Sequence, residues 1–312
     1  MRVVGVTEFG GPEALRVVEV PEPHAGPGQV RIRVAAAAVN PTDTLLREGG
    51  QRGRLAEQTP PYVPGMDAAG TVDEVGAGVP DRYVGEQVMA VVVPASPTKG
   101  AYAESLVVPA EQVVPVPAGL SLVQAATLPM NGLTTVLALD ALALRPGDVL
   151  AVTGAAGAVG GYAVQLGTAR GLRVLADAAP GDVELVRSLG AETVVARGDD
   201  VADRFREIVP GGVPGLVDGA ILNELAAPAV ADGGGLAALR YWQGEPGRGI
   251  TVHRIMVGAA AGRTDLLDGL RAAAEAGTIT ARVADTYPAE RAAEAHRRLA
   301  AGGVRGRLVL TF

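Results

Sequence analysis

Cysteine is absent from this chain of 312 residues, and histidine occurs only as His24, His253 and His296. The lack of cysteine excludes disulfides, thiol nucleophiles, iron–sulfur clusters and every zinc site with a cysteine ligand. The three histidines are far apart and form neither an HxH nor an HxxxH pattern, so we expect no metal site. Aromatic residues make up only 3% of the chain, whereas its 43 glycines suit close packing of helices on a sheet.

Runs of positive charge and long apolar runs are also missing. The net charge is −7 and no cluster of Lys or Arg stands out, so we expect no nucleic-acid partner. The first 20 residues lack the charged-then-apolar order of a signal peptide, and no apolar run reaches the roughly 18–20 residues that span a bilayer. The sequence therefore predicts a cytoplasmic protein without a membrane partner.

Two kinds of sequence pattern follow each other along the chain. Residues 1–118 read as short strands separated by Pro and Gly, with the alternating stretch Val30-Arg31-Ile32-Arg33-Val34 as an example. After Pro117, helical and strand-like stretches alternate, which predicts an α/β fold with a parallel, doubly wound sheet. The predicted elements of this second part are helices at 121–144, 158–170, 182–189, 264–276 and 288–300, and strands at 149–153, 173–176, 193–195, 216–217, 236–239 and 307–311.

A glycine-rich turn joins the predicted strand at 149–153 to the predicted helix at 158–170. It reads Gly154-Ala155-Ala156-Gly157-Ala158-Val159-Gly160, so that Ala155 takes the first glycine position of G-x-G-x-x-G. Glycine lets the backbone approach a pyrophosphate closely, and the following helix presents N–H groups and the positive end of its dipole. We expect these seven residues to bind a dinucleotide. The alternative is a turn that only allows the helix to pack on the sheet.

An acidic residue, Asp177, lies at the end of the next predicted strand. Such an acid commonly bonds the ribose 2′-hydroxyl and repels a 2′-phosphate, which favours NADH. The alternative is a solvated carboxylate at the end of a strand. In that case Arg173 or Arg187 could neutralise a 2′-phosphate.

Six segments, in order, cover nearly the whole chain and carry a family likeness. They are Ala38-Val39-Asn40-Pro41-Thr42-Asp43, Pro64-Gly65-Met66-Asp67-Ala68-Ala69-Gly70, Gly100-Ala101-Tyr102-Ala103-Glu104, Leu128-Pro129-Met130-Asn131-Gly132-Leu133-Thr134-Thr135, the glycine loop, and Gly306-Arg307-Leu308-Val309-Leu310. In these segments the chain resembles the zinc-free quinone oxidoreductase (zeta-crystallin-like) branch of the medium-chain dehydrogenase/reductase superfamily.

The resemblance implies two domains. A GroES-like β-rich domain would comprise 1–118 and 262–312, and a Rossmann domain would comprise 119–261. It further implies a homodimer, or a tetramer of dimers, formed through the edge of the Rossmann sheet, for which the strand at 250–257 is the candidate. The zinc-dependent members carry a Cys near position 40 and a Gly-His-Glu where this chain has Gly65-Met66-Asp67. Methionine does not ligate zinc as histidine does, so we expect neither a catalytic nor a structural metal.

The same resemblance assigns roles to three polar residues. Asn40 would lie near the nicotinamide and donate to a substrate oxygen that gains negative charge, or it would only fix the turn into Pro41. Asp43 is either a catalytic residue or the cap of a helix that starts near Thr44. Asp67 would either hold the loop that replaces the zinc site or contact the substrate.

Further contacts with the cofactor are expected in four places. By resemblance, Asn131 and Thr135 begin a helix that contacts the nicotinamide half, or they serve only helix packing. Asp218, after the strand at 216–217, is another candidate. Arg240, followed by Tyr241 and Trp242, would either line the cofactor or substrate site or pack internally.

The proton donor is not evident from the sequence. Members of the family often have a Tyr five residues after the Asn, but this chain has Leu45 there. Tyr62, Tyr241 or water would have to substitute. Lys99, the only lysine, falls in an expected loop and is interpreted as solvated rather than catalytic.

Together these features predict hydride transfer from NADPH to an electron-poor conjugated acceptor, a quinone or another enone. NADH stays open because of Asp177. A quinone needs no strong acid, since its reduced oxygens can take protons from solvent. The alternatives are an enoyl reductase that acts on an acyl thioester or a natural-product intermediate, and a non-catalytic NADPH-binding sensor or scaffold.

Overall fold

The computed structural model describes residues 1–96, 99–240 and 242–312. Its two compact units are interleaved in sequence. Unit 1 consists of Met1–Met130, Gly258–Glu275 and Ala281–Phe312, and unit 2 consists of Asn131–Val257 and Ala276–Thr280. Residues 119–130 thus fall with the N-terminal part, whereas the predicted domain boundary lies at residue 118, and the exact extent of the domains stays a prediction.

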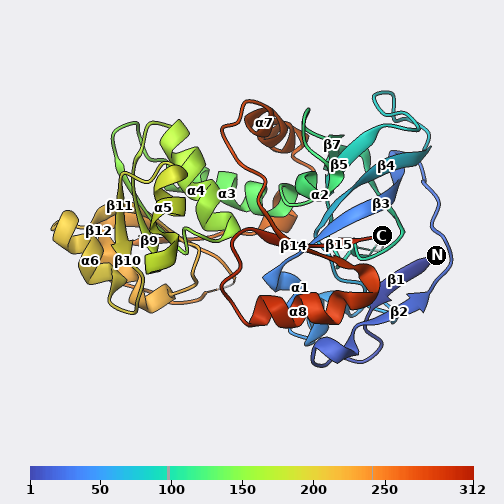
Figure 1. Ribbon diagram of the computed structural model, residues 1–312, viewed down its shortest axis with the longest axis horizontal. Coiled ribbons are helices and arrows are strands. Elements are labelled where there is room, and N and C mark those ends of the chain that lie inside the picture. Colours follow the sequence, from blue (N-terminus) through green and yellow to red (C-terminus); the bar gives the residue numbers. More distant parts are fainter. Residues whose placement is uncertain (97–98, 241) are drawn as a thin grey trace. The chain divides into compact units, whose positions relative to one another are not determined.

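Unit 1 is built on a largely antiparallel sheet (Figure 1). The strand order is β14-β15-β3-β4-β5-β7, with β6 also paired to β3, and β1 and β2 form a separate hairpin. The alternating stretch expected at 30–34 lies inside the long strand β3, where Val30, Ile32 and Val34 point into the core. The strands are β1 (Arg2–Gly5), β2 (Arg16–Glu19), β3 (Gln29–Val39), β4 (Asp67–Val75), β5 (Gln87–Val91), β6 (Ser105–Pro109), β7 (Val113–Pro115), β14 (Val283–Pro288) and β15 (Arg307–Thr311).

The helices of unit 1 are short. They are α1 (Pro41–Arg47), α2 (Leu122–Ala125), α7 (Thr264–Glu275) and α8 (Ala292–Ala300). Helix α1 starts one turn earlier than expected, because Asn40 is its N-cap and Pro41 supplies a helical φ at the first position. The expectation that Asp43 caps a helix starting near Thr44 is therefore wrong, since Asp43 is the third helical residue.

The predicted helix at 121–144 is interrupted. Helix α2 ends at Ala125, and α3 (Pro129–Leu142) follows, because proline lacks an N–H group and disfavours helical geometry at the residue before it. The segment Leu122–Leu142 is long and apolar enough to cross a membrane, with a mean hydropathy of 1.3. However, 72% of it is buried inside the protein, as in the core helix of a globular domain.

Unit 2 is a six-stranded parallel sheet with the order β10-β9-β8-β11-β12-β13 (Figure 1). This is the doubly wound dinucleotide-binding order, so the predicted α/β fold is confirmed. Its strands are β8 (Val149–Thr153), β9 (Arg173–Ala178), β10 (Thr193–Ala196), β11 (Val213–Asp218), β12 (Val230–Ala238) and β13 (Thr251–Arg254), and its other helices are α4 (Ala158–Ala169), α5 (Val183–Ser188) and α6 (Val201–Ile208).

Both faces of the sheet in unit 2 are covered. Leu150 and Val152 of β8 pack with α3, α4 and α5, whereas Ala151, between them, packs with α6. Successive side chains of a strand point to opposite faces, so this division follows from the pleat. Two short 3-10 helices, Asn223–Leu225 and Ala227–Ala229, make up the crossover from β11 to β12.

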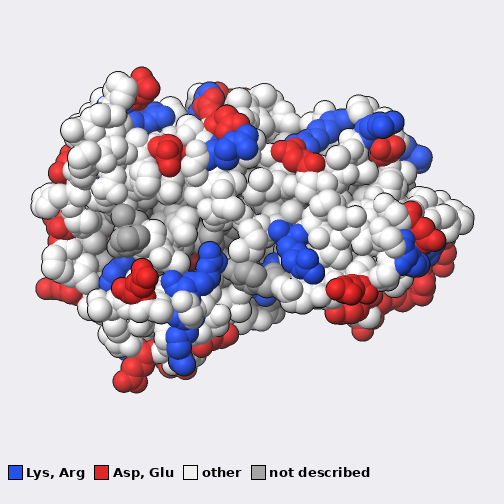
Figure 2. Space-filling view, turned by 180° about the vertical axis from the view of Figure 1, so that it is seen from behind, with Lys and Arg blue, Asp and Glu red and all other residues white. Residues whose placement is uncertain are grey.

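Charged side chains lie mainly on the surface, where Figure 2 shows acidic and basic residues interspersed among uncharged ones. Ion pairs such as Arg2 with Glu104 and Arg173 with Glu192, both at 2.7 Å, join neighbouring segments. Exposed pairs of this kind contribute little to stability, typically below about 1 kcal/mol. The fold therefore depends on its apolar cores rather than on surface charge.

Candidate functional site

The glycine loop (residues 154–160) turns tightly between β8 and α4. Gly154 has a φ of +65°, a left-handed conformation that glycine adopts without strain. A Cβ atom on Gly160 would lie 2.2 Å from the Gly154 carbonyl oxygen, so the first turn of α4 rests directly on the loop. Ala155 is fully buried in the core, which explains why a methyl group is accepted in the first glycine position of the motif.

Helix α4 offers its N-terminus without a side-chain cap. It begins at Ala158 after Gly157, an N-cap residue that has no side chain to hydrogen-bond the first amides of the helix. A Cβ atom on Gly157 would meet the Gly154 carbonyl oxygen at 3.1 Å and nothing else within 4 Å, so the approach is narrow but open. The amides in the first turn of a helix have no intrahelical carbonyl partner. Loop and helix together fit a pyrophosphate, whose oxygens accept from such amides.

Asp177 faces the glycine loop. Its Oδ1 accepts hydrogen bonds from the Gly154 amide at 2.7 Å and the Ala155 amide at 3.3 Å, and the residue is only 4% exposed. It lies inside β9 rather than after it, because the strand runs two residues further than expected. Burial raises the pKa of the Asp177 carboxyl, against the two amides and the nearby positive charge of Arg197. This carboxylate holds the loop, and its contact with a ribose stays a prediction.

Asp218, the last residue of β11, holds the neighbouring turn. It is fully buried. Its carboxylate accepts from the Thr153 hydroxyl at 2.6 Å, the Leu222 amide at 3.1 Å and the Asn223 amide at 2.7 Å. Because Thr153 ends β8, this network joins the carboxyl ends of two adjacent strands beside the glycine loop.

The other cofactor candidates divide into two groups. Thr135 donates to the Asn131 carbonyl at 2.9 Å and to the Val159 carbonyl at 3.3 Å, which ties α3 to the first turn of α4. Arg187 instead pairs with Glu184 on the surface of α5. Arg240 is exposed, with a φ of +60°, and Tyr241 lies outside the described residues.

Sequence reasoning missed Arg197 as a cation near Asp177. Its amide donates to the Ala178 carbonyl at 2.9 Å, which places Arg197 where β9 and β10 end side by side. The residue is exposed. The signal was present, since ligands of doubly wound sheets bind at the carboxyl ends of the strands. The sequence pattern had instead pointed to Arg173 and Arg187, which pair with Glu192 and Glu184.

In unit 1, Asn40, Asp43 and Asp67 form one buried cluster. The Asn40 amide donates to Asp43 Oδ2 at 2.7 Å, and the Gly65 amide donates to Asp43 Oδ1 at 3.0 Å. Asn40 Nδ2 donates to Asp67 Oδ2 at 2.6 Å, and the Met130 amide donates to Asp67 Oδ1 at 2.5 Å. The cluster therefore ties the start of α1, the turn before β4 and the start of α3.

The two carboxyl groups of this cluster are shielded from water. Asn40, Asp43 and Asp67 are 0%, 1% and 0% exposed. Burial raises the pKa of Asp43 to about 6 and that of Asp67 to about 7, although the hydrogen bonds to each carboxylate oppose the rise. Both groups therefore titrate close to neutral pH.

The remaining candidates in unit 1 are tied to their neighbours. Tyr62 stacks on Phe9 with ring centroids 4.9 Å apart. Lys99 is not simply solvated, because its Nζ donates to the Thr59 and Pro61 carbonyls at 3.1 and 2.9 Å. Leu45 lies in α1, where it brings no polar group.

The residues that stand where zinc-dependent members of the family have their metal ligands do not fit zinc. Within residues 1–96, 99–240 and 242–312, no group of three or more His, Asp or Glu side chains is arranged to hold a metal ion. At the position in question, the Thr42 hydroxyl donates to Met66 Sδ at 3.2 Å. A hydroxyl and a thioether are not the thiolate and imidazole ligands that zinc prefers.

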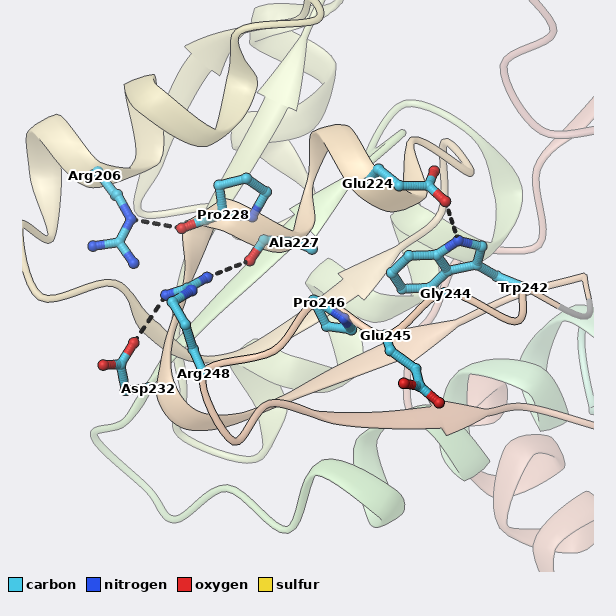
Figure 3. Close-up of a pocket in the computed structure, with 10 residues that line it drawn as sticks. All are labelled: Arg206, Glu224, Ala227, Pro228, Asp232, Trp242, Gly244, Glu245, Pro246 and Arg248. Atoms are coloured by element: carbon cyan, nitrogen blue, oxygen red, sulfur yellow. Dashed lines mark hydrogen bonds and ion pairs between the residues drawn. The ribbon is translucent and has the colours of Figure 1, made fainter.

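A cavity of about 680 Å³ in unit 2 lies elsewhere (Figure 3). Trp242 lines it, whereas the glycine loop, Asp177 and Asp218 do not. Arg206 and Arg248 point at the backbone of its wall, where they donate to the Pro228 and Ala227 carbonyls at 2.6 and 3.1 Å, and Trp242 donates to Glu224 at 2.6 Å. These donors already have protein acceptors, so the cavity does not offer a ready anion site.

Comparisons with known proteins agree with this arrangement. Residues 26–118 match the alcohol dehydrogenase GroES-like domain, and residues 189–310 match the zinc-binding dehydrogenase family. The chain is 32% identical to a 2-haloacrylate reductase of Burkholderia sp over 96% of each chain. It is 33% identical to the synaptic vesicle membrane protein VAT-1 homolog of Rattus norvegicus and 37% identical to a quinone oxidoreductase of Mus musculus, over 70% and 57% of this chain. The matched part spans 53% and 52% of those two relatives.

Solved structures show the same fold over the full chain. A quinone oxidoreductase from Coxiella burnetii superposes with a TM-score of 0.89 at 25% identity, covering 100% of this chain and 99% of that one. A mycobacterial protein complexed with NADPH gives a TM-score of 0.87 at 28% identity, covering 100% of both. Both superpositions extend over the whole of this chain.

Proposed function

Since this chain belongs to the zinc-free quinone oxidoreductase branch of the medium-chain dehydrogenase/reductase superfamily, a family of NAD(P)H-dependent oxidoreductases, we propose that it reduces a conjugated carbonyl compound with NADPH. The observation that carries the proposal is the glycine loop, which leads into a helix N-terminus without a side-chain cap. When bound, NADPH supplies a hydride, and solvent supplies the one proton that completes the reduced product.

The residues of the loop would hold the cofactor through their backbone. The amides of residues 158–160, in the first turn of α4, would bind the pyrophosphate. Asp177 holds the Gly154 and Ala155 amides, and Asp218 keeps the neighbouring turn in place. Thr135 fixes α3 against this turn. Asn131, Arg187 and Arg240 remain candidates for direct contact with the cofactor.

We favour NADPH over NADH on two grounds. One relative of known structure is complexed with NADPH. In addition, the Asp177 carboxylate is turned toward the glycine loop, while Arg197 is exposed at the adjacent strand ends, so a 2′-phosphate would meet a cation there. Fluorescence titrations of the protein with NADPH and with NADH give the two Kd values, and their comparison tests this preference directly.

The acceptor is proposed to be a quinone. A specific observation favours a second candidate, the carbon–carbon double bond of an activated acrylate or enoyl compound, because the 2-haloacrylate reductase matches over 96% of both chains. Stopped-flow loss of NADPH absorbance with quinones, haloacrylates and enoyl thioesters separates the two. Turnover of quinones alone supports the first candidate, turnover of the alkenes alone supports the second, and no turnover contradicts both.

We further propose that Asn40, Asp43 and Asp67 position the acceptor-binding part of unit 1. All three are buried, and each bonds to protein groups, so the geometry favours shaping of the site over direct contact. A turnover assay of Asp67→Asn, which keeps the shape but not the charge, tests this role.

A cytoplasmic homodimer completes the proposal. Strand β13 (Thr251–Arg254) is one of the two edges of the parallel sheet in unit 2, and an edge strand presents unpaired backbone groups to a second copy. Light scattering after gel filtration would report the mass, and a monomer would contradict this part of the proposal.

A further inference from the structure

Four side chains form a continuous chain of hydrogen bonds in the core of unit 1. Arg47 NH1, at the end of α1, lies 3.1 Å from His296 Nδ1 in α8. His296 Nε2 lies 3.2 Å from the Tyr102 hydroxyl, and that hydroxyl lies 3.1 Å from Asp43 Oδ2. The four residues are 3%, 1%, 0% and 1% exposed, so water does not compete for these bonds.

The chain of hydrogen bonds runs in a single direction, from donor to acceptor. A guanidinium only donates, so His296 Nδ1 accepts from Arg47 and carries no hydrogen. The neutral imidazole then carries its hydrogen on Nε2, which donates to the Tyr102 oxygen. Above its pKa of about 6 the Asp43 carboxyl is ionised and only accepts, so there the Tyr102 hydroxyl donates to Asp43. The two charged ends therefore fix every donor between them.

The surrounding charges support this assignment. Burial, together with the charge of Arg47, lowers the pKa of His296 to about 3. Burial and then Asp43 raise the pKa of the Tyr102 hydroxyl well above its ordinary value. Arg47 and Tyr102 face the imidazole, while Asp43, Asp67 and Arg307 act on the hydroxyl. A second proton on His296 would turn Nδ1 into a donor aimed at another donor.

We propose that His296 is a positioning residue for the reaction, which acts by orienting the Tyr102 hydroxyl toward Asp43. The Asp43 oxygen that accepts from Tyr102 also accepts from the Asn40 amide, and its other oxygen accepts from the Gly65 amide. One oriented carboxylate thereby sets both turns. This inference rests on the proposed function, because it assumes that the acceptor binds beside these turns.

Space around Tyr102 is limited, which makes the orientation matter. Gly65 has a φ of +105°, and a Cβ atom there would lie 2.7 Å from Tyr102 Cδ1. The ring of His296 meets that of Tyr102 edge to face, with centroids 5.9 Å apart. A shift of the tyrosine ring would therefore be passed to the 65–67 turn rather than absorbed by a void.

The tautomer can be read without any assay of activity. Only three histidines exist, so selective nitrogen-15 labelling of histidine resolves each imidazole by NMR. We expect one imidazole, missing from the spectrum of His296→Gln, that keeps its hydrogen on Nε2 and does not titrate between about pH 8 and about pH 5. A hydrogen on Nδ1 of His296, or titration of this imidazole within that range, would overturn the proposal.

Kinetics with matched variants test the positioning role. Glutamine at 296 can still donate to Tyr102 and accept from Arg47, whereas leucine can do neither. We expect kcat/KM to fall about tenfold in His296→Leu and in Tyr102→Phe, with no further loss in the double variant, and to fall less than about threefold in His296→Gln. The affinity for NADPH, which depends on unit 2, stays unchanged, and Tyr83→Phe, at an exposed tyrosine, is the control.

The remaining outcomes distinguish failure of the positioning role from failure of the proposed function. Equal losses in His296→Gln and His296→Leu, or additive losses in the double variant, would reduce the chain to a structural role and overturn the proposal. A complete lack of turnover by the unmodified enzyme would overturn the proposed function and the positioning role with it. In that case the NMR result would still decide whether the directional chain exists.

Discussion

The glycine loop of unit 2 and the buried cluster of unit 1 hold their atoms in place in different ways. The loop uses backbone amides and the absence of side chains, and its glycines lie within seven consecutive residues. The cluster uses side chains from distant parts of the chain, with 249 residues between Arg47 and His296. The loop fits any ligand that accepts from amides, whereas the cluster depends on the identity of every member.

This difference predicts where substitutions act. In the loop, an added methyl group should do more harm than a changed polar group, because space against backbone is what the ligand needs. In the cluster, size matters less than hydrogen bonding, because each buried donor that loses its acceptor costs about 1–3 kcal/mol.

Gly160→Ala is expected to have the largest effect. Its Cβ atom would lie 2.2 Å from the Gly154 carbonyl oxygen, which is backbone and cannot rotate away. We expect the Kd for NADPH to rise about a hundredfold, or the free energy of unfolding to fall by about 3 kcal/mol, as for an overpacked core. Fluorescence titration and urea unfolding measure the two. Gly269→Ala, in α7, has nothing within 4 Å of the new Cβ atom and serves as the control.

Asp67→Leu is expected to come next. It leaves the Met130 amide and Asn40 Nδ2 without their acceptor, so the free energy of unfolding should fall by about 2–3 kcal/mol. Asp67→Asn keeps one oxygen for the Met130 amide and should lose less. Urea unfolding of both variants measures the difference. Equal losses would mean that shape rather than hydrogen bonding holds the cluster, as in the loop.

Arg197→Ala should act on the cofactor alone. Loss of the cation at the ends of β9 and β10 should weaken binding of NADPH about tenfold and leave NADH unaffected, because only NADPH carries the 2′-phosphate. Arg291→Ala removes an exposed arginine of unit 1 that already pairs with Glu294 and should change neither affinity. If NADPH and NADH weaken together in Arg197→Ala, the 2′-phosphate is not recognised there.

The loop and the cluster also differ in how far the sequence reveals them. Strand β8, the glycine turn and the start of α4 follow from local pattern, since glycine at 154, 157 and 160 has a direct steric meaning. Asn40, Asp43 and Asp67 are found through family resemblance, but the direction of their hydrogen bonds is not. Tyr102 and His296 carry no signal of a shared role, because 194 residues separate them and only tertiary packing brings them together.

Asp177 shows the same limit on a smaller scale. Its position after a predicted strand is local information, but whether its carboxylate faces solvent or the loop depends on two more residues of strand. The pairing of β9 with β8 and β10 carries the strand to Ala178, where burial overrides the preference of aspartate for an exposed position. The orientation of a side chain at a strand end therefore requires the sheet, not only the segment.

The smallest expected effect is a pH dependence of the free energy of unfolding, which the buried carboxyl of Asp67 should cause. Burial raises the pKa of Asp67 to about 7, so the folded chain keeps a proton that the unfolded chain releases near pH 4. The free energy of unfolding therefore falls as pH rises through 7, by about 1 kcal/mol between about pH 6.5 and 8. His296 acts in the opposite direction, mainly below about pH 6.5, because its lowered pKa keeps it neutral in the folded state while the unfolded state takes up a proton. Urea unfolding measures the free energy of unfolding against pH for the unmodified chain and for Asp67→Asn, and both proteins contain His296. A steeper fall in the unmodified chain would therefore be due to Asp67. Equal slopes would show that the Asp67 carboxyl is already ionised throughout this range.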